Sequence, residues 1–183
     1  MDPNGQIPKY TLCNTYDTVA SAAESLSTRS TLILYCQGSD LGLPDGKLSI
    51  IALSDPAASE VFLFDVISLR DKYNPSIALL SFLLQSPDIT KFVWDGRTYA
   101  YELADTYGIL LQGTIDLQLV EASTRGSTDK GHRVQHTRNH FRRITDHDGT
   151  ALVLPDDIHK LLGLFHCAGL YYLPNANPGK NGE

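Results

Sequence analysis

Two apolar runs separated by a polar turn near the beginning of the chain predict a β-hairpin. Residues 32–36 and 48–53 are short and apolar, and residues 38–46 between them are rich in Gly and Asp. Apolar runs of this length that are bounded by turn residues are typical of strands that return beside one another. A third run of aromatic and β-branched residues, 61–66, follows the turn at 54–59. We therefore expect three strands joined by short turns.

Apolar residues at helical spacing predict the helices that surround these strands. The buried face of the first helix, expected over 18–26 behind the capping residues Thr15 and Asp17, is formed by Val19, Ala22, Ala23 and Leu26. Further along, the pattern predicts a helix from Pro75, a strand at 91–94, a helix at 97–107 that ends at Gly108, a strand at 113–116 and a helix at 117–122. Strands that alternate with helices favour parallel pairing, so the pattern predicts a mixed α/β domain.

The hydrophobic periodicity fades over residues 123–149, which are rich in Arg, His, Thr and Gly. We expect a basic, partly helical insertion or a loop there. Periodicity returns at 152–154, and Asp156 starts another apolar helix. Residues 174–183 are polar and rich in Pro, Gly and Asn, as in a flexible tail. With 183 residues in all, one domain over 1–173 is expected.

Charge and cysteine content limit the possible partners and compartments. The formal net charge is −6, so binding of nucleic acid would have to depend on a local basic patch. Three scattered cysteines without metal-binding spacing predict buried thiols in a reducing compartment. The N-terminus lacks signal-peptide features, and no apolar run approaches the ~18 residues of a membrane span. We therefore expect an intracellular protein, cytoplasmic or nuclear, without a membrane partner.

The first hairpin resembles the first motif of the 3′-5′ exonuclease domains of the DEDD superfamily. In that motif a strand carries Asp-x-Glu followed by Gly, and Gly-Lys-Leu starts the next strand. Here Cys36, Gly38 and residues 46–48 keep this frame. The two carboxylate positions of the motif hold Tyr35 and Gln37.

Later segments carry the same resemblance. Residues 91–103, KFVWDGRTYAYEL, resemble the second motif, with Tyr99 at the place of its metal-binding Asp. Residues 108–122 resemble the segment that follows, in which Asp116 and Gln118 are retained. Residues 165–173, FHCAGLYYL, resemble the third motif. Phe165 there stands for the Tyr that positions the attacking water, and Gly169 for the last metal-binding Asp.

The resemblance implies a ribonuclease H-like 3′-5′ exonuclease fold, a five-stranded mixed sheet of three antiparallel and then two parallel strands with helices on both faces. In the family, two divalent ions about 4 Å apart are held by several anionic oxygens. All four carboxylate positions are neutral in this chain, namely Tyr35, Gln37, Tyr99 and Gly169. We therefore expect no catalytic residue and no cofactor. The alternative is an active enzyme that holds Mg²⁺ or Mn²⁺ through the displaced ligands Asp40, Asp45, Asp95 or Glu102.

Basic side chains provide the candidate nucleic-acid contacts. They are Arg97, Lys130, Arg133, Arg138, Arg142 and Arg143. Such a cluster in an acidic chain is typical either of a surface that follows a phosphate backbone or of an exposed polar loop. We therefore expect a catalytically degenerate module of RNA metabolism that binds single-stranded RNA weakly. The other expected partners are a protein or a second copy of the chain.

Aromatic residues at and around the replaced positions have two possible roles. The set comprises Tyr35, Trp94, Tyr99, Phe165, Tyr171 and Tyr172. These side chains could stack on bases or fill the space that metal ions occupy in the family. Filling is favoured, because aromatic side chains are usually part of a core. Tyr35 in particular is expected to pack against Tyr99 or Phe165.

Overall fold

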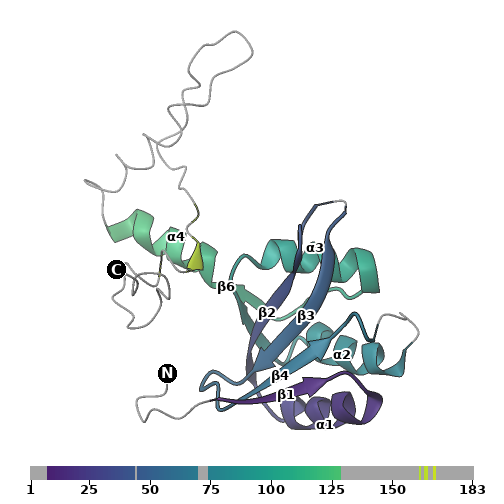
Figure 1. Cartoon of the computed structure of the whole chain (residues 1–183). Coiled ribbons are helices and arrows are strands. Elements are labelled where there is room, and N and C mark those ends of the chain that lie inside the picture. The colour runs from purple at the N-terminus through teal and green to yellow at the C-terminus, as the bar shows by residue number, and fades with distance from the viewer. Residues whose placement is uncertain are drawn as a thin grey trace, which may run out of the picture. The chain divides into compact units, whose positions relative to one another are not determined.

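The computed structural model describes residues 8–43, 45–69 and 74–128, together with Leu161, Gly163, Leu164 and Cys167 (Figure 1). For residues 125–128 it describes only the backbone. The chain divides into two compact units, Met1–Asp116 and Leu117–Glu183.

A six-stranded mixed sheet forms the first unit. Its strands are β1 (Lys9–Cys13), β2 (Thr31–Ser39), β3 (Lys47–Ser54), β4 (Glu60–Asp65), β5 (Thr90–Val93) and β6 (Thr114–Asp116). They lie in the order β1-β4-β3-β2-β5-β6. Strands β4, β3 and β2 are antiparallel, and β5 and β6 continue the sheet from β2 in parallel. The predicted α/β class and the succession of three antiparallel and two parallel strands are confirmed.

Strand β1 is a sixth strand that the sequence pattern did not predict. It pairs in parallel with β4, from Lys9 beside Glu60 to Cys13 beside Phe64. Cys13 is the one buried residue of β1, so the strand lacks the apolar alternation by which strands are recognised. An ion pair of 2.7 Å between Lys9 and Glu60 accompanies the backbone pairing. The expectation of five strands was therefore one strand short.

Three helices belong to the first unit, and each begins at a residue with a clear local cause. α1 (Tyr16–Ser27) begins after Thr15, whose side chain forms a capping box with Thr18. α2 (Pro75–Gln85) begins after Asn74, whose side-chain oxygen accepts a hydrogen bond of 2.9 Å from the amide of Ser76. α3 (Gly96–Tyr107) ends at Gly108 in the left-handed conformation. The predicted helix positions are confirmed to within two residues.

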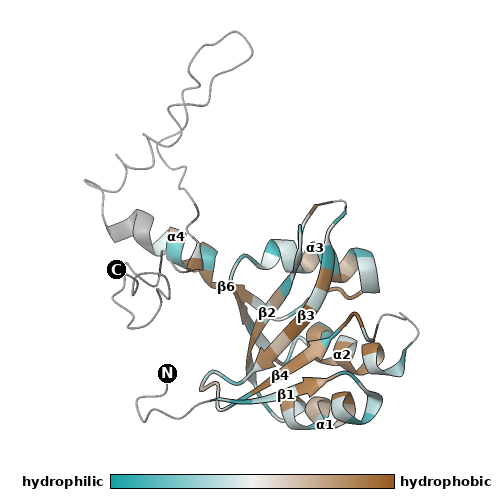
Figure 2. Ribbon diagram, viewed as in Figure 1, coloured by the Kyte–Doolittle hydropathy of each residue, from teal (hydrophilic) through white to brown (hydrophobic). Residues whose placement is uncertain are grey.

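All three helices cover one face of the sheet (Figure 1). Leu32, Leu34 and Cys36 of β2 point toward this face and are buried. Tyr35 and Gln37 alternate to the other face and are exposed. The hydrophobic residues of the first unit are concentrated in its strands and in the helix surfaces behind them (Figure 2). Helices on the other face remain a prediction, because α4 (Leu117–Thr128) belongs to the second unit.

The second unit is described mainly through α4, which extends the helix expected at 117–122 to Thr128. The hydroxyl of Thr124 donates a hydrogen bond of 2.9 Å to the carbonyl of Val120. The rest of the insertion expected at 123–149 and the tail lie outside the described residues, and of the helix expected after Asp156 only Leu161, Gly163, Leu164 and Cys167 are described. None of the helices in the described ranges is long and apolar enough to cross a membrane.

Lys91 of β5 is fully buried among these apolar side chains and links the sheet to α2. Its ammonium group donates to the carbonyl oxygens of Ser86 at 2.6 Å and Leu83 at 3.3 Å. Carbonyls at the C-terminal end of a helix lack helical partners and carry a partial negative charge. Burial lowers the pKa of Lys91 to about 8, because the charged form loses its hydration.

Replacement of Lys91 by Met should change how stability depends on pH. The pKa of Lys91 is about 8 in the folded chain and 10.5 when unperturbed. Between these two pH values Lys91 is more often protonated in the unfolded chain than in the folded chain. Its contribution to the free energy of unfolding therefore increases as the pH rises, by at most about 1.4 kcal/mol per pH unit. In urea denaturation, the stability of the parent minus that of Lys91→Met should therefore increase from about pH 7 to about pH 10. A difference that is independent of pH would contradict this description of Lys91.

Candidate functional site

The candidate site lies where β2 loses its strand partner on one side. β5 pairs with β2 only from Thr31 to Ile33, whereas β2 continues to Ser39 with an irregularity between Gln37 and Gly38. Among the described residues, no strand covers this edge of β2 beyond Ile33. α3 follows β5 almost directly and brings Tyr99 to Tyr35 and Cys36. Three of the four positions that the resemblance assigns to metal-binding carboxylates are thus gathered here.

Tyr35 contacts both Gln37 and Tyr99, so that three uncharged polar side chains are joined through it. The Tyr35 and Tyr99 rings meet edge to face, with centroids 6.3 Å apart and planes at 85°. The hydroxyl of Tyr35 donates a short hydrogen bond to Oε1 of Gln37. Tyr99 is buried at 7% exposure, whereas Tyr35 is 46% exposed. The expected contact between Tyr35 and Tyr99 is therefore present, although Tyr35 does not fill a buried space.

Protonation keeps the buried member of this cluster neutral. Burial raises the pKa of Tyr99 to about 12, and a backbone hydrogen bond with Cys36 partly opposes the shift. Burial likewise raises the pKa of the Cys36 thiol to about 12, with a further contribution from the nearby charge of Glu102. Neither group ionises near neutral pH, and a thiol held in this form is unreactive. The prediction of buried cysteines is confirmed for Cys13, Cys36 and Cys167.

This set of donors does not suit a two-metal centre. Divalent ions of the Mg²⁺ type prefer several carboxylate oxygens, and a carboxamide and two phenols occupy the positions that the resemblance assigns to such carboxylates. The Tyr35 hydroxyl and the Gln37 carbonyl also satisfy each other by their hydrogen bond. Within the described ranges, no group of three or more His, Cys, Asp or Glu side chains could hold a metal ion. Gly169 and Phe165 lie outside those ranges.

Glu102, one of the alternative ligands, instead anchors the hairpin between β2 and β3 to α3. It is 3% exposed, and its Oε1 accepts a hydrogen bond of 2.8 Å from the amide of Gly42. A β-carbon on Gly46 would come within 2.2 Å of the same oxygen. Gly42 has φ +83°, and a β-carbon there would meet the Thr98 side chain at 2.9 Å. Both glycines therefore permit a close approach of the hairpin to α3.

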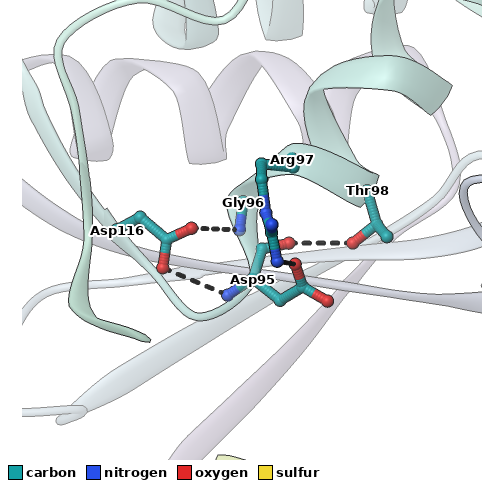
Figure 3. Close-up of polar contacts among 5 residues, drawn as sticks. All are labelled: Asp95, Gly96, Arg97, Thr98 and Asp116. Atoms are coloured by element: carbon teal, nitrogen blue, oxygen red, sulfur yellow. Dashed lines mark hydrogen bonds and ion pairs between the residues drawn. The ribbon is translucent and has the colours of Figure 1, made fainter. Parts of the chain in front are cut away.

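Asp95 and Asp116 position the beginning of α3 (Figure 3). Asp95 is in the left-handed conformation, with φ 57°, and its side chain makes no capping bond. Asp116 of β6 supplies the cap instead, because its carboxylate accepts hydrogen bonds from the amides of Asp95 at 3.3 Å and Gly96 at 2.9 Å. A carboxylate at this end also complements the helix dipole. Asp116 was expected only as a retained residue of the family motif, and this role was missed.

The remaining acidic candidates and Arg97 are on the surface. Arg97 makes an ion pair of 3.0 Å with Asp95, and both side chains are partly exposed. Asp40 has φ 50°, and its carbonyl accepts a turn hydrogen bond from Leu43 at 3.0 Å. Arg97 is the one expected nucleic-acid contact whose side chain is described. The others, Lys130, Arg133, Arg138, Arg142 and Arg143, lie outside the described residues.

The fold is that of RNase D-like 3′-5′ exonuclease domains. RNase D of Trypanosoma brucei matches with a TM-score of 0.60 and 20% identity, over 89% of this chain and 53% of that one. RNase D of Escherichia coli matches with a TM-score of 0.54 and 21% identity, over 87% of this chain and 40% of that one. The EXD2 exonuclease domain matches with a TM-score of 0.55 and 17% identity, over 81% of this chain and 78% of that one.

The similarity to these structures concerns the fold. The chain spans about half the length of the Trypanosoma brucei enzyme. No model of a protein family matches the sequence, and no curated protein matches it.

Glu102→Ala should destabilise the first unit by about 1–3 kcal/mol, because the amide of Gly42 would lose a charged acceptor. The amide hydrogen of Gly42 should also exchange faster in the variant. The matched control is Asp105→Ala, which removes an exposed acid from the same helix and should change stability by less than about 0.5 kcal/mol. Urea denaturation and amide exchange measure the two effects. Equal behaviour of the two variants would contradict the anchoring role of Glu102.

Proposed function

We propose that this chain is a non-hydrolytic 3′-5′ exonuclease-like domain that binds single-stranded RNA. The observation that carries the proposal is the neutral cluster of Tyr35, Gln37 and Tyr99 at three positions where the resemblance places metal-binding carboxylates. Hydrolysis through two metal ions requires anionic ligands that hold the ions and activate water. The described part of the cluster offers no such ligand, and its buried phenol stays protonated at neutral pH.

Binding without hydrolysis is consistent with the electrostatics of the cluster. Carboxylates in these positions would repel the phosphates of a nucleic acid unless metal ions neutralised them. Neutral amide and phenol groups remove that repulsion, so a phosphodiester chain can approach without a metal. The basic residues expected over 125–143 would add a local attraction in an otherwise acidic chain.

We favour RNA over a protein as the partner, because one of the structures with a similar fold is a complex with RNA. The structure of Trypanosoma brucei RNase D with the RNA U12 matches this chain with a TM-score of 0.61 and 20% identity, over 92% of this chain and 59% of that one. A role in RNA metabolism follows if the similarity in fold extends to the ligand. A protein partner or a homodimer takes its place if RNA does not bind.

The alternative of an active enzyme would need displaced ligands, and the described contacts of two of the four acidic candidates count against it. The carboxylate of Glu102 holds the amide of Gly42, and that of Asp95 pairs with Arg97. Asp40 and Asp45 are exposed, and Asp40 contributes its backbone carbonyl to a turn. Recruitment of Glu102 to a metal would therefore cost the anchor of the hairpin. This makes a rearranged centre less favourable than a neutral, metal-free site.

A labelled RNA tests the proposal. Single-stranded RNA with a 5′ label, incubated with the full chain and Mn²⁺, should keep its length while its fluorescence anisotropy rises, and EDTA should leave that rise unchanged. The controls are Asp95→Asn and Glu102→Gln, which should change neither result. The proposal would be overturned if the RNA were shortened from its 3′ end with Mn²⁺ but not with EDTA. Loss of this shortening in Asp95→Asn or Glu102→Gln would identify that residue as a displaced ligand.

A further inference from the structure

Tyr35 presents an aromatic ring that is held in place and yet open to solvent. Tyr99 contacts the ring from the side, edge to face, and Gln37 binds its hydroxyl. Tyr35 nevertheless remains 46% exposed. A side chain that is ordered before binding loses little conformational freedom on contact with a ligand, so an exposed and immobilised ring is a favourable surface for stacking.

The surroundings of Tyr35 supply the polar groups that a nucleotide requires. Gln37 is exposed, and its amide nitrogen donates to no partner among the residues that the structure describes. Two residues further along β2, Ser39 pairs with Lys47 of β3, which is exposed and makes no ion pair with any described residue. At about 3.3 Å per residue, this pair lies about 13 Å along the strand from Tyr35.

We propose that Tyr35, Gln37 and Lys47 form a short metal-independent subsite for single-stranded RNA. In this subsite a base stacks on Tyr35, and Lys47 attracts a phosphate of a neighbouring nucleotide. This inference rests on the proposed function and names the contacts through which it acts. Stacking on an aromatic side chain tolerates any base, so binding here is independent of RNA sequence.

The difference in exposure between Tyr35 and Tyr99 supports a role for Tyr35 in stacking on a base, and not in filling the space of the metal ions. Tyr99 is buried and packs beneath the surface, whereas Tyr35 lies above it with almost half of its area in water. A ring that only filled space would be buried like Tyr99. The phenol and the amide also bring no charge that would repel an RNA phosphate.

Fluorescence anisotropy with a labelled 12-nucleotide RNA, in EDTA and about 50 mM salt, tests the subsite. Tyr35→Ala should weaken binding about 5- to 150-fold, the range that corresponds to about 1–3 kcal/mol for one stacked base. Tyr35→Phe keeps the ring and should bind within about threefold of the parent. The matched control is Tyr16→Ala, which removes a tyrosine of similar exposure, 51%, at the start of α1 and should bind like the parent.

An abasic backbone of the same length separates stacking from charge. The parent should bind it more weakly than the RNA, whereas Tyr35→Ala should show a smaller difference between the two. If Tyr35→Ala binds RNA like the parent, the proposed subsite is wrong. The proposed RNA-binding function would still hold in that case if a variant with Arg138, Arg142 and Arg143 all replaced by Ala lost its binding to RNA. If the parent binds no RNA at about 50 mM salt, the subsite and the RNA-binding function both fail.

Discussion

The open edge of β2 beyond Ile33 is the constraint on which the candidate site depends. A strand edge without a neighbour exposes backbone donors and acceptors, which must find other partners. Here α3 lies beside that edge and places Tyr99 against Tyr35 and within a hydrogen bond of the Cys36 backbone. The cluster therefore follows from the shortness of β5, because a longer β5 would pair with this part of β2 and leave no room for a side chain from α3.

α3 can occupy this place because several separate contacts determine its position. Asp116 caps its first amides from β6, and Glu102 binds the hairpin at Gly42 (Figure 3). These acidic side chains act as hydrogen-bond acceptors for backbone amides, and that role needs no metal ion. Acidic groups close to the candidate site thus have a structural explanation, whereas the groups at its centre are neutral. The proposed loss of hydrolysis and the proposed retention of RNA binding both follow from this distribution of charge.

Much of the fold could be predicted from the sequence, because the helix ends are encoded locally. Thr15 and Gly108 mark helix boundaries through short-range hydrogen bonds and backbone conformation that neighbouring residues determine. β1 could not be predicted, because it buries a single side chain and so shows no apolar pattern. It also pairs with a distant strand, since Lys9 lies beside Glu60, which is 51 positions away in the sequence.

The candidate site was predictable only in part, because some of its contacts also join residues that are far apart in the sequence. Tyr35 was expected to pack against Tyr99 or Phe165, because the resemblance assigns these residues to positions of one site, and the contact with Tyr99 is present. The bond between Glu102 and Gly42 joins residues 60 positions apart, and no local pattern indicates it. The exposure of Tyr35 was also unpredictable, because it depends on how deeply α3 packs beside β2.

Calorimetric titration of the full chain with Mn²⁺ measures whether the neutral site binds a divalent metal. We expect heats no larger than those of dilution at near-neutral pH, and the same result for Gln37→Ala, since the neutral groups of the cluster cannot hold the ion. A saturable two-site isotherm that is lost on Asp95→Asn or Glu102→Gln would contradict a metal-free site and establish a rearranged metal centre.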